Sequence, residues 1–227
     1  MKILSIGKVL KHDSLDITSI KLSALIEHEN IEEYHYIIIN GGDGTIRRVL
    51  KHICNLQHIP IFILNPTGSF NVIAKIHKSP KIDYVLDKLS KKESLKIDKH
   101  DYFKLNNEIF LFSAGNIGDL QHILLSETFR FGWLKDGALK YILAFILLLP
   151  THLIMTPFML FNKRKFFIFT PMSFIKKIGN FYGKVPNQLD IDLDNEYNMM
   201  ELDGDIVTIK EQYITIKKLG KLQIVSQ

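Results

Sequence analysis

Two short, strongly apolar runs mark the N-terminal part of the chain, and each leads into a glycine-containing turn. Residues 36–39 read Tyr-Ile-Ile-Ile, and residues 61–64 read Ile-Phe-Ile-Leu. Continuous apolar runs of this length are typical of strands that are buried on both faces of a parallel sheet. Helical patterns follow over residues 45–54 and 81–89, so the order of the elements predicts βαβ units.

The flanking segments complete the predicted organisation. Residues 2–6 predict another strand. Residues 17–28 predict an amphipathic helix, because several apolar side chains fall on one helical face: Ile17, Ile20, Leu22 and Leu25. From Leu95 onward, short apolar segments alternate with turns, which is typical of antiparallel strands. We therefore expect an α/β protein, with a parallel-sheet nucleotide-binding domain over residues 1–97 and a mainly antiparallel β domain over residues 98–227.

An Asp-x-Asp-x-Asp pattern occupies residues 190–194, and Glu201 follows at the twelfth place of a calcium loop. The glycine that such a loop needs at its sixth place is Asn195 here. Leucine and isoleucine alternate with the aspartates, so the segment predicts a strand with its carboxylates facing water.

Residues 141–161 contain no Asp, Glu, Lys or Arg, a length that reaches the range of membrane-spanning helices. Pro150 and Pro157 interrupt this run, and each removes a helical hydrogen bond. We expect a core helix near residues 137–149 followed by a buried strand. A surface that enters the membrane interface and a true span are the alternatives, and the basic residues 163–165 would suit anionic headgroups.

Composition indicates an intracellular protein that meets anionic partners. The formal net charge is +5, and Cys54 is the single cysteine, which excludes an intramolecular disulfide framework. Charged residues interrupt the N-terminus early, so we expect no signal peptide and a cytoplasmic location. Aromatic residues are not interleaved with basic ones, and nucleic acid is therefore not an expected partner.

The turn after the first apolar run has the composition of a phosphate-binding loop. Residues 40–45 read Asn-Gly-Gly-Asp-Gly-Thr. Glycine lets backbone N–H groups approach an anion closely, and the helix that follows offers the positive end of its dipole. The candidate phosphate-binding residues of this turn are Gly41, Gly42, Asp43, Gly44 and Thr45.

This turn and a second motif, Pro-Thr-Gly-Ser-Phe-Asn-Val-Ile-Ala at residues 66–74, together resemble the diacylglycerol kinase catalytic family. A third element, Glu-Leu-Asp-Gly-Asp at residues 201–205, resembles that family's Asp-Gly-Glu element. The resemblance implies an ATP-dependent lipid kinase that uses Mg²⁺, a lipid substrate, and a peripheral position at the inner membrane face. It also adds Gly68, Ser69 and Asn71 to the phosphate-binding residues.

The same resemblance implies that Asp203 is the catalytic general base and that Asp205 orients it or the metal. Asp-Gly is also a frequent hairpin turn, so Asp203 and Gly204 predict a β-turn in addition. The metal ligands cannot be read from the residues.

The chain departs from the family in ways that favour two other interpretations. The family's Asn-Pro-x-Ser-Gly loop is missing before residue 40, Arg47 and Arg48 replace Asn-Glu, and Asp205 replaces a glutamate. A degenerate nucleotide- or lipid-binding protein without activity is one alternative. NAD kinase, which shares the Gly-Gly-Asp-Gly turn, is the other.

Overall fold

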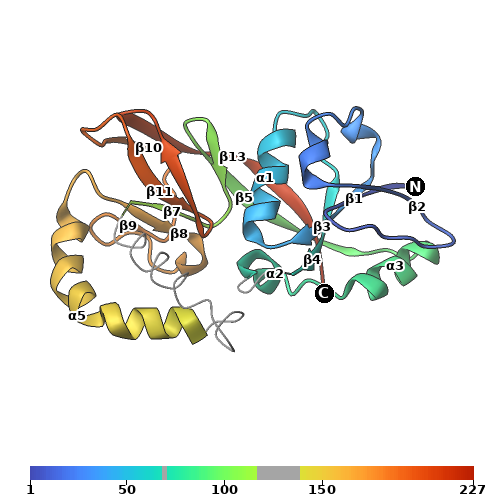
Figure 1. The fold of residues 1–227 in the computed structure, drawn as a ribbon, viewed down its shortest axis with the longest axis horizontal. Helices are drawn as coiled ribbons and strands as arrows, with labels where there is room; N and C mark the ends of the chain where they lie inside the picture. Colours follow the sequence, from blue (N-terminus) through green and yellow to red (C-terminus); the bar gives the residue numbers. More distant parts are fainter. Residues whose placement is uncertain (68–70, 117–138) are drawn as a thin grey trace. The chain divides into compact units, whose positions relative to one another are not determined.

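The computed structural model forms two compact units, each described by itself (Figure 1). The residues that the structure describes are 1–67, 71–116 and 139–227. Unit 1 comprises Met1–Tyr102 and Gly220–Gln227, and unit 2 comprises Phe103–Leu219. The second expected domain began at residue 98 and ran to the end of the chain, whereas the structure returns Gly220–Gln227 to unit 1.

A parallel sheet forms the centre of unit 1, as the two apolar runs predicted. Its parallel strands are β1 (Lys2–Ile6), β2 (Asp16–Ile20), β3 (Tyr36–Gly41), β4 (Ile61–Pro66) and β13 (Tyr213–Ser226), and β5 (Lys96–Leu105) extends the same sheet beside β13. The strand order is β2-β1-β3-β4-β13-β5, and β6 (Glu108–Phe110) follows β5. Strands β1 to β4 pair in parallel, and β13 joins β4 in parallel where Ile224 lies opposite Phe62. The predicted α/β class is confirmed.

Helices pack on this sheet through apolar stripes. The helices of unit 1 are α1 (Asp43–Ile53), α2 (Val72–Ile76) and α3 (Ile82–Ser90), with short 3₁₀ turns η1 (Leu22–Leu25) and η2 (Ile31–Glu33). In α1 the buried apolar residues follow the spacing of one helical face: Ile46, Val49, Leu50 and Ile53. Helix α3 buries Val85, Leu86 and Leu89 against side chains of β1, β3 and β4. Helix α3 and the sheet thereby share one core.

The prediction of an amphipathic helix over residues 17–28 is wrong. This segment contains strand β2, which pairs in parallel with β1, and then the 3₁₀ turn η1. The sequence of β2 is Asp-Ile-Thr-Ser-Ile, and its β-branched residues favour an extended backbone. Ile17 and Ile20 fit a helical spacing equally well, which is why periodicity misassigned them.

Unit 2 is mainly antiparallel, as expected. It contains β6 and those parts of β5 and β13 that lie between Phe103 and Leu219. Its other strands are β7 (Ser113–Gly115), β8 (Phe167–Phe169), β9 (Phe181–Tyr182), β10 (Gln188–Asp192), β11 (Asn198–Leu202) and β12 (Asp205–Ile209). A 3₁₀ turn, η4 (Thr170–Met172), follows β8. One sheet has the order β12-β11-β7-β8-β9, in which only β8 and β9 pair in parallel. Strand β10 pairs antiparallel with β13, and Asp190 and Asp192 are exposed while Ile191 is buried. The expectation that these aspartates lie on the wet face of a strand is confirmed.

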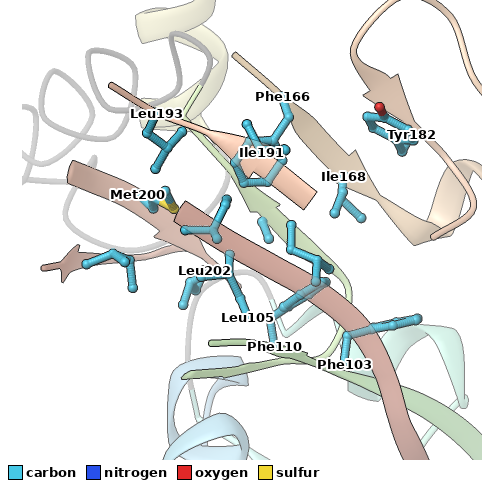
Figure 2. Packing of buried hydrophobic residues seen from close by; sticks show 14 residues of the cluster. Phe103, Leu105, Phe110, Phe166, Ile168, Tyr182, Ile191, Leu193, Met200 and Leu202 are labelled. Carbon is cyan, nitrogen blue, oxygen red and sulfur yellow. The ribbon is translucent and has the colours of Figure 1, made fainter. Parts of the chain in front are cut away.

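The core of unit 2 lies among these strands (Figure 2). Its largest buried side chains include Phe110 and Phe166, and Met200 and Leu202 enter it from β11. The rings of Phe103 and Phe110 stack with centroids 5.1 Å apart. Met200 and Leu202, which alternate along β11, thus face the core. This fixes the register of the hairpin that β11 forms with β12.

The apolar run at residues 141–161 forms one helix, α5 (Leu139–Phe161), with Pro150 and Pro157 inside it. The expected buried strand is therefore absent, and the expected core position is wrong as well, because most of the described side chains of α5 are exposed. The Leu- and Met-rich sequence favours helix throughout, and the prolines interrupt single hydrogen bonds without ending the helix. Figure 1 shows that α5 bends along its course, as prolines commonly cause. Across the described residues, no helix meets the length and apolarity that crossing a membrane requires.

Candidate active site

The first glycine motif links the end of β3 to the start of α1. Gly41 ends the strand, Gly42 is the N-cap of the helix, and Asp43 is its first residue. The N–H groups of Thr45 and Ile46 both donate to the Gly42 carbonyl, at 2.9 and 3.2 Å. No side chain caps this helix end, so N–H groups of its first turn are available to a ligand. The geometry is that of an anion site at a helix N-terminus.

Gly41 and Gly42 serve different purposes. A Cβ built on Gly41 would lie 2.4 Å from the Thr45 Oγ1 atom, so the glycine makes room for this threonine. Gly42 has φ −95° and ψ −170°, an extended conformation that any residue adopts. The backbone conformation at position 42 therefore does not require glycine. A ligand that approaches the loop closely would be the reason for a residue without a side chain.

The second motif follows β4, the neighbour of β3 in the sheet. Gly41 lies opposite Pro66 in the register of the two strands, and the Thr67 N–H donates to the Gly41 carbonyl at 3.4 Å. Asn71 is the N-cap of α2 and has a left-handed backbone with φ 46°. Gly68 and Ser69, predicted to bind phosphate, lie outside the described residues.

Asp43 connects the two motifs. Its Oδ2 atom accepts the Val72 N–H at 2.7 Å, and its Oδ1 atom accepts the Ile73 N–H at 3.0 Å. Both donors belong to the first turn of α2. Burial raises the pKa of Asp43, while these two hydrogen bonds and the charge of Lys75 act against the rise. The carboxyl group therefore holds the second loop to the first.

A pair of asparagines that the sequence analysis did not single out also joins the strand ends. Asn40 and Asn65 lie opposite each other in β3 and β4, and Asn65 Nδ2 donates to Asn40 Oδ1 at 2.7 Å. Asn40 Nδ2 in turn donates to the Ser5 Oγ and the Ile6 carbonyl. Their signal in the sequence is that each asparagine directly ends a buried apolar run. The amides fix the carboxyl ends of three neighbouring strands, where ligands of open α/β sheets bind.

The third motif lies in unit 2 at the hairpin between β11 and β12. Asp203 and Gly204 form its two-residue turn, with φ 52° and 87°. Positive φ at both central positions is the geometry of a type I′ turn. The predicted hairpin is confirmed.

Although Asp203 belongs to this turn, it is buried, with 4% of its surface exposed. Its Oδ2 atom accepts the Leu111 N–H at 2.7 Å, and its Oδ1 atom accepts those of Phe112 and Ser113 at 2.8 and 3.1 Å. Burial raises the pKa of Asp203 to about 8, the three hydrogen bonds oppose the rise, and the nearby charge of Glu201 adds to it. A carboxyl group with a pKa near neutrality suits proton exchange at physiological pH.

Glu201 is a second buried acid at this hairpin, and the motif comparison gave it no role. Its Oε1 atom accepts the Ser113 hydroxyl at 2.7 Å and also the Gly204 N–H. Asp205, the other residue predicted to be catalytic, is half-buried at the start of β12. The structure therefore brings Glu201, Asp203 and Ser113 into one hydrogen-bonded group.

The two sets of candidate residues belong to different units. Asp43 and Asn71 gather with the glycine turn in unit 1, whereas Asp203 and Asp205 lie in unit 2. Within the ranges that the structure describes, no three His, Cys, Asp or Glu side chains are grouped as a metal site. A cavity of about 460 Å³ beside α3, lined by Lys81, Tyr84 and Lys88 among others, contains none of the predicted site residues.

Comparison with known proteins shows what part of the chain is similar to. Residues 10–101 match the diacylglycerol kinase catalytic domain. The match to this diacylglycerol kinase domain contains both glycine motifs, so the resemblance inferred from the residues is confirmed there. The third motif, at residues 201–205, lies beyond the match.

A relative of this chain has a name that agrees with the match. A protein of Streptococcus pneumoniae serotype 4 (strain ATCC BAA-334 / TIGR4) that bears the name "Putative lipid kinase" is 30% identical over 110 residues. These residues are 47% of this chain and only 36% of that relative, so the chain matches about a third of the relative's length.

Solved structures extend the likeness to the whole chain. Two structures from Bacillus anthracis str. Sterne, described as "a putative diacylglycerol kinase", cover 100% of this chain and 97% of their own, with TM-scores of 0.54 and 0.55. Sequence identity is 15% and 14%, so the likeness establishes the fold. The predicted pairing of a parallel-sheet domain with an antiparallel β domain of diacylglycerol kinase type is confirmed.

Proposed function

We propose that this protein is an ATP-dependent lipid kinase that transfers the γ-phosphoryl group to the hydroxyl of a diacylglycerol- or sphingoid-type lipid. One observation carries the proposal: two glycine-containing loops end adjacent parallel strands, and Asp43 joins the first loop to the helix that follows the second. The match of residues 10–101 to the diacylglycerol kinase catalytic domain supports a phosphoryl donor in this region.

ATP would bind through its phosphates at these loops. The uncapped first turn of α1, with Gly42 and Gly44, supplies backbone N–H groups and the positive end of a helix dipole. Thr45 can donate its hydroxyl, and Gly68, Ser69 and Asn71 would complete the cradle from the second loop. The remaining charge of the polyphosphate needs a cation.

Mg²⁺ would fill that role together with ATP. The described residues offer no group of three acidic or histidine ligands. This is compatible with Mg²⁺, which keeps several waters and commonly takes one or two carboxylates besides the substrate phosphates. Asp205 is half-buried, and we propose it as the carboxylate that orients the metal or the base.

Asp203 is proposed as the proton acceptor. In the reaction the lipid hydroxyl loses its proton to the carboxylate, its oxygen bonds to the γ-phosphorus, and the bond to the ADP oxygen breaks. With its pKa raised to about 8, Asp203 is a stronger base in its ionised form, and the fraction in that form grows as the pH approaches 8. ADP and a phosphorylated lipid are the products, and we propose that the enzyme works at the cytoplasmic face of a membrane, where ATP and a membrane lipid meet.

A second candidate function is binding without catalysis. It is favoured by the three backbone N–H groups that already occupy both carboxylate oxygens of Asp203. Under this alternative the protein holds nucleotide or lipid, and Asp203 only anchors residues 111–113.

Transfer measurements on three variants separate the two candidates. Asp203→Asn should lower turnover about 10²–10⁴-fold if the residue is the base, while ATP affinity persists. Asp205→Asn should lower turnover less, and Asp205→Glu should retain activity. A folded Asp203→Asn enzyme with turnover within a few-fold of the parent would leave Asp203 as a loop anchor.

A further inference from the structure

Helix α5 presents a broad apolar surface. Ten of the large hydrophobic side chains that the structure describes in this helix are exposed: Leu139, Ile142, Phe145, Ile146, Leu147, Leu149, Leu153, Ile154, Phe158 and Phe161. Among the side chains of α5 that the structure describes, Ala144 alone is fully buried. At 100° per residue the exposed positions cover more than half of the helix circumference. A surface of this size and composition indicates an interaction site.

Basic side chains lie directly beside this surface. Lys163 and Arg164 follow the helix and are exposed, and Lys165 is half-buried. Arg164 pairs with Asp194 at 2.9 Å, and Lys165 donates to the Asn116 carbonyl at 3.3 Å. Lys163 is exposed, and its ammonium group can reach an anion in the solvent or at a membrane surface.

A second exposed group in the same unit repeats the combination. Phe174 is 79% exposed and Ile178 is 55% exposed, and the exposed Lys176 and Lys177 lie between them in sequence. Apolar side chains therefore stand next to cations in two segments of unit 2.

These features fit a membrane surface better than a protein partner. Residues 141–161 contain no Asp, Glu, Lys or Arg, whereas a protein interface surrounds its apolar centre with a polar rim. A bilayer has its apolar region beneath a layer of headgroups, so apolar side chains can insert while the flanking cations remain at the headgroups. The carbonyls that Pro150 and Pro157 leave without helical donors can be hydrated at that depth.

We infer that α5 is a membrane-docking helix, which lies in the interface of a bilayer that contains anionic lipid, with Lys163 and Arg164 at the headgroups. The inference rests on the proposed function in one respect, because a lipid kinase must reach its acceptor within a bilayer. Binding to the bilayer itself needs neither ATP nor turnover.

Flotation with lipid vesicles tests the inference directly. The full chain, without ATP, is mixed with vesicles of phosphatidylcholine alone or of phosphatidylcholine with phosphatidylglycerol. We expect binding to the anionic vesicles, weaker binding to the neutral ones, and a loss of the difference at high salt, which screens charges.

Matched substitutions locate the contact. Ile154 is 65% exposed on α5, and Ile26 is 75% exposed in unit 1. Ile154→Glu should weaken vesicle binding at least about tenfold, because a carboxylate is expelled from the interface, and Ile26→Glu should not change it. Lys163→Gln should weaken binding to anionic vesicles about fivefold, and Lys8→Gln, which changes an exposed lysine of unit 1, should not.

Three results would overturn the inference. The first is no binding to either kind of vesicle, and the second is an equal loss of vesicle binding for Ile154→Glu and Ile26→Glu. The third is a parent protein that self-associates without binding vesicles and that Ile154→Glu converts to monomers. The last result would assign the surface to a second copy of the chain. Kinase activity on detergent-dispersed lipid is measured separately, so a failure of docking and a failure of the proposed reaction are distinguishable.

Discussion

Asp43 and Asp203 have the same structural role in different units. Each is a buried carboxyl group in a glycine-containing turn, and each accepts backbone N–H groups from a segment far away in sequence. A carboxylate can accept from several donors, whereas an amide of the same shape must present an NH₂ group to one of them. These two residues therefore offer a direct test of whether the motifs stabilise the fold.

We expect Asp43→Asn to destabilise unit 1 by about 1–3 kcal/mol, because one N–H at the start of α2 would face a donor and lose its partner. Chemical denaturation measures the difference. Asp83→Asn removes an exposed acid from the first turn of α3 and serves as the matched control, with an expected change within about 0.5 kcal/mol. Equal effects of the two substitutions would show that the bridge adds no stability.

The pKa of Asp203 predicts a pH dependence of stability. Folding raises this pKa to about 8 from its ordinary value of 3.8, so the folded protein keeps a proton that the unfolded chain has lost between about pH 4 and pH 8. Stability must then fall as the pH rises through this window. Between pH 5 and pH 8 we expect the parent to lose on the order of 2–4 kcal/mol more than Asp203→Asn. Parallel pH profiles for the two proteins would mean that Asp203 is ionised in the fold.

The turn chemistry at these residues was readable from the sequence, but their burial was not. Asp-Gly predicts a two-residue hairpin because both positions need positive φ, and Asp203 and Gly204 have it. The three N–H donors come from residues 111–113, and no local pattern announces a contact over such a separation. Glu201 was missed for the same reason.

Among the elements, those whose pattern was unambiguous were predicted correctly. The runs that became β3 and β4 are apolar without interruption, because both faces of a central parallel strand are covered. Residues 17–20 carried too few apolar positions to separate a period of 2 from one of 3.6. In α5, two prolines outweighed a helix-favouring composition in the prediction, although a long helix can lose single hydrogen bonds and continue.

The glycine loop between β3 and α1 gives a prediction for nucleotide binding. Gly42→Val should fold like the parent, since the φ of −95° is open to valine. Its side chain would occupy the space that a phosphate oxygen needs, so ATP affinity should fall at least about tenfold, the effect of losing about 1.4 kcal/mol of contact. Calorimetric titration and circular dichroism measure the two properties. Unchanged affinity in a folded variant would reduce this loop to a simple turn.

A paired substitution at the hairpin between β11 and β12 tests the left-handed turn. A Cβ at Gly204 meets nothing within 4 Å, but its φ is 87°, which L side chains rarely adopt. We expect Gly204→Ala to destabilise unit 2 by roughly 1 kcal/mol through backbone strain alone. Gly204→Asn should cost less, because asparagine tolerates this conformation. Equal costs of the two substitutions in thermal unfolding would mean that the positive φ is not the source of the cost.

For the whole molecule, three ordered motifs predicted the fold class and the resemblance to the diacylglycerol kinase catalytic domain, and the match to that domain covers the two motifs that lie in unit 1. The acceptor could not be predicted, since apolar pockets carry little spacing signature in a sequence. The exposure of α5 could not be predicted either, because an apolar run has the same composition in a core as on a membrane surface.

Transfer of labelled phosphate from ATP tests the central claim most directly. The protein is incubated with Mg²⁺, ATP labelled at the γ-position, and a panel of diacylglycerols, sphingoid bases, other hydroxylated lipids and NAD, and the products are identified by mass. The account predicts label in a lipid whose mass has risen by one phosphate group, and none in NAD. Nucleotide binding without any phosphorylated lipid, or phosphorylated NAD as the main product, would contradict it.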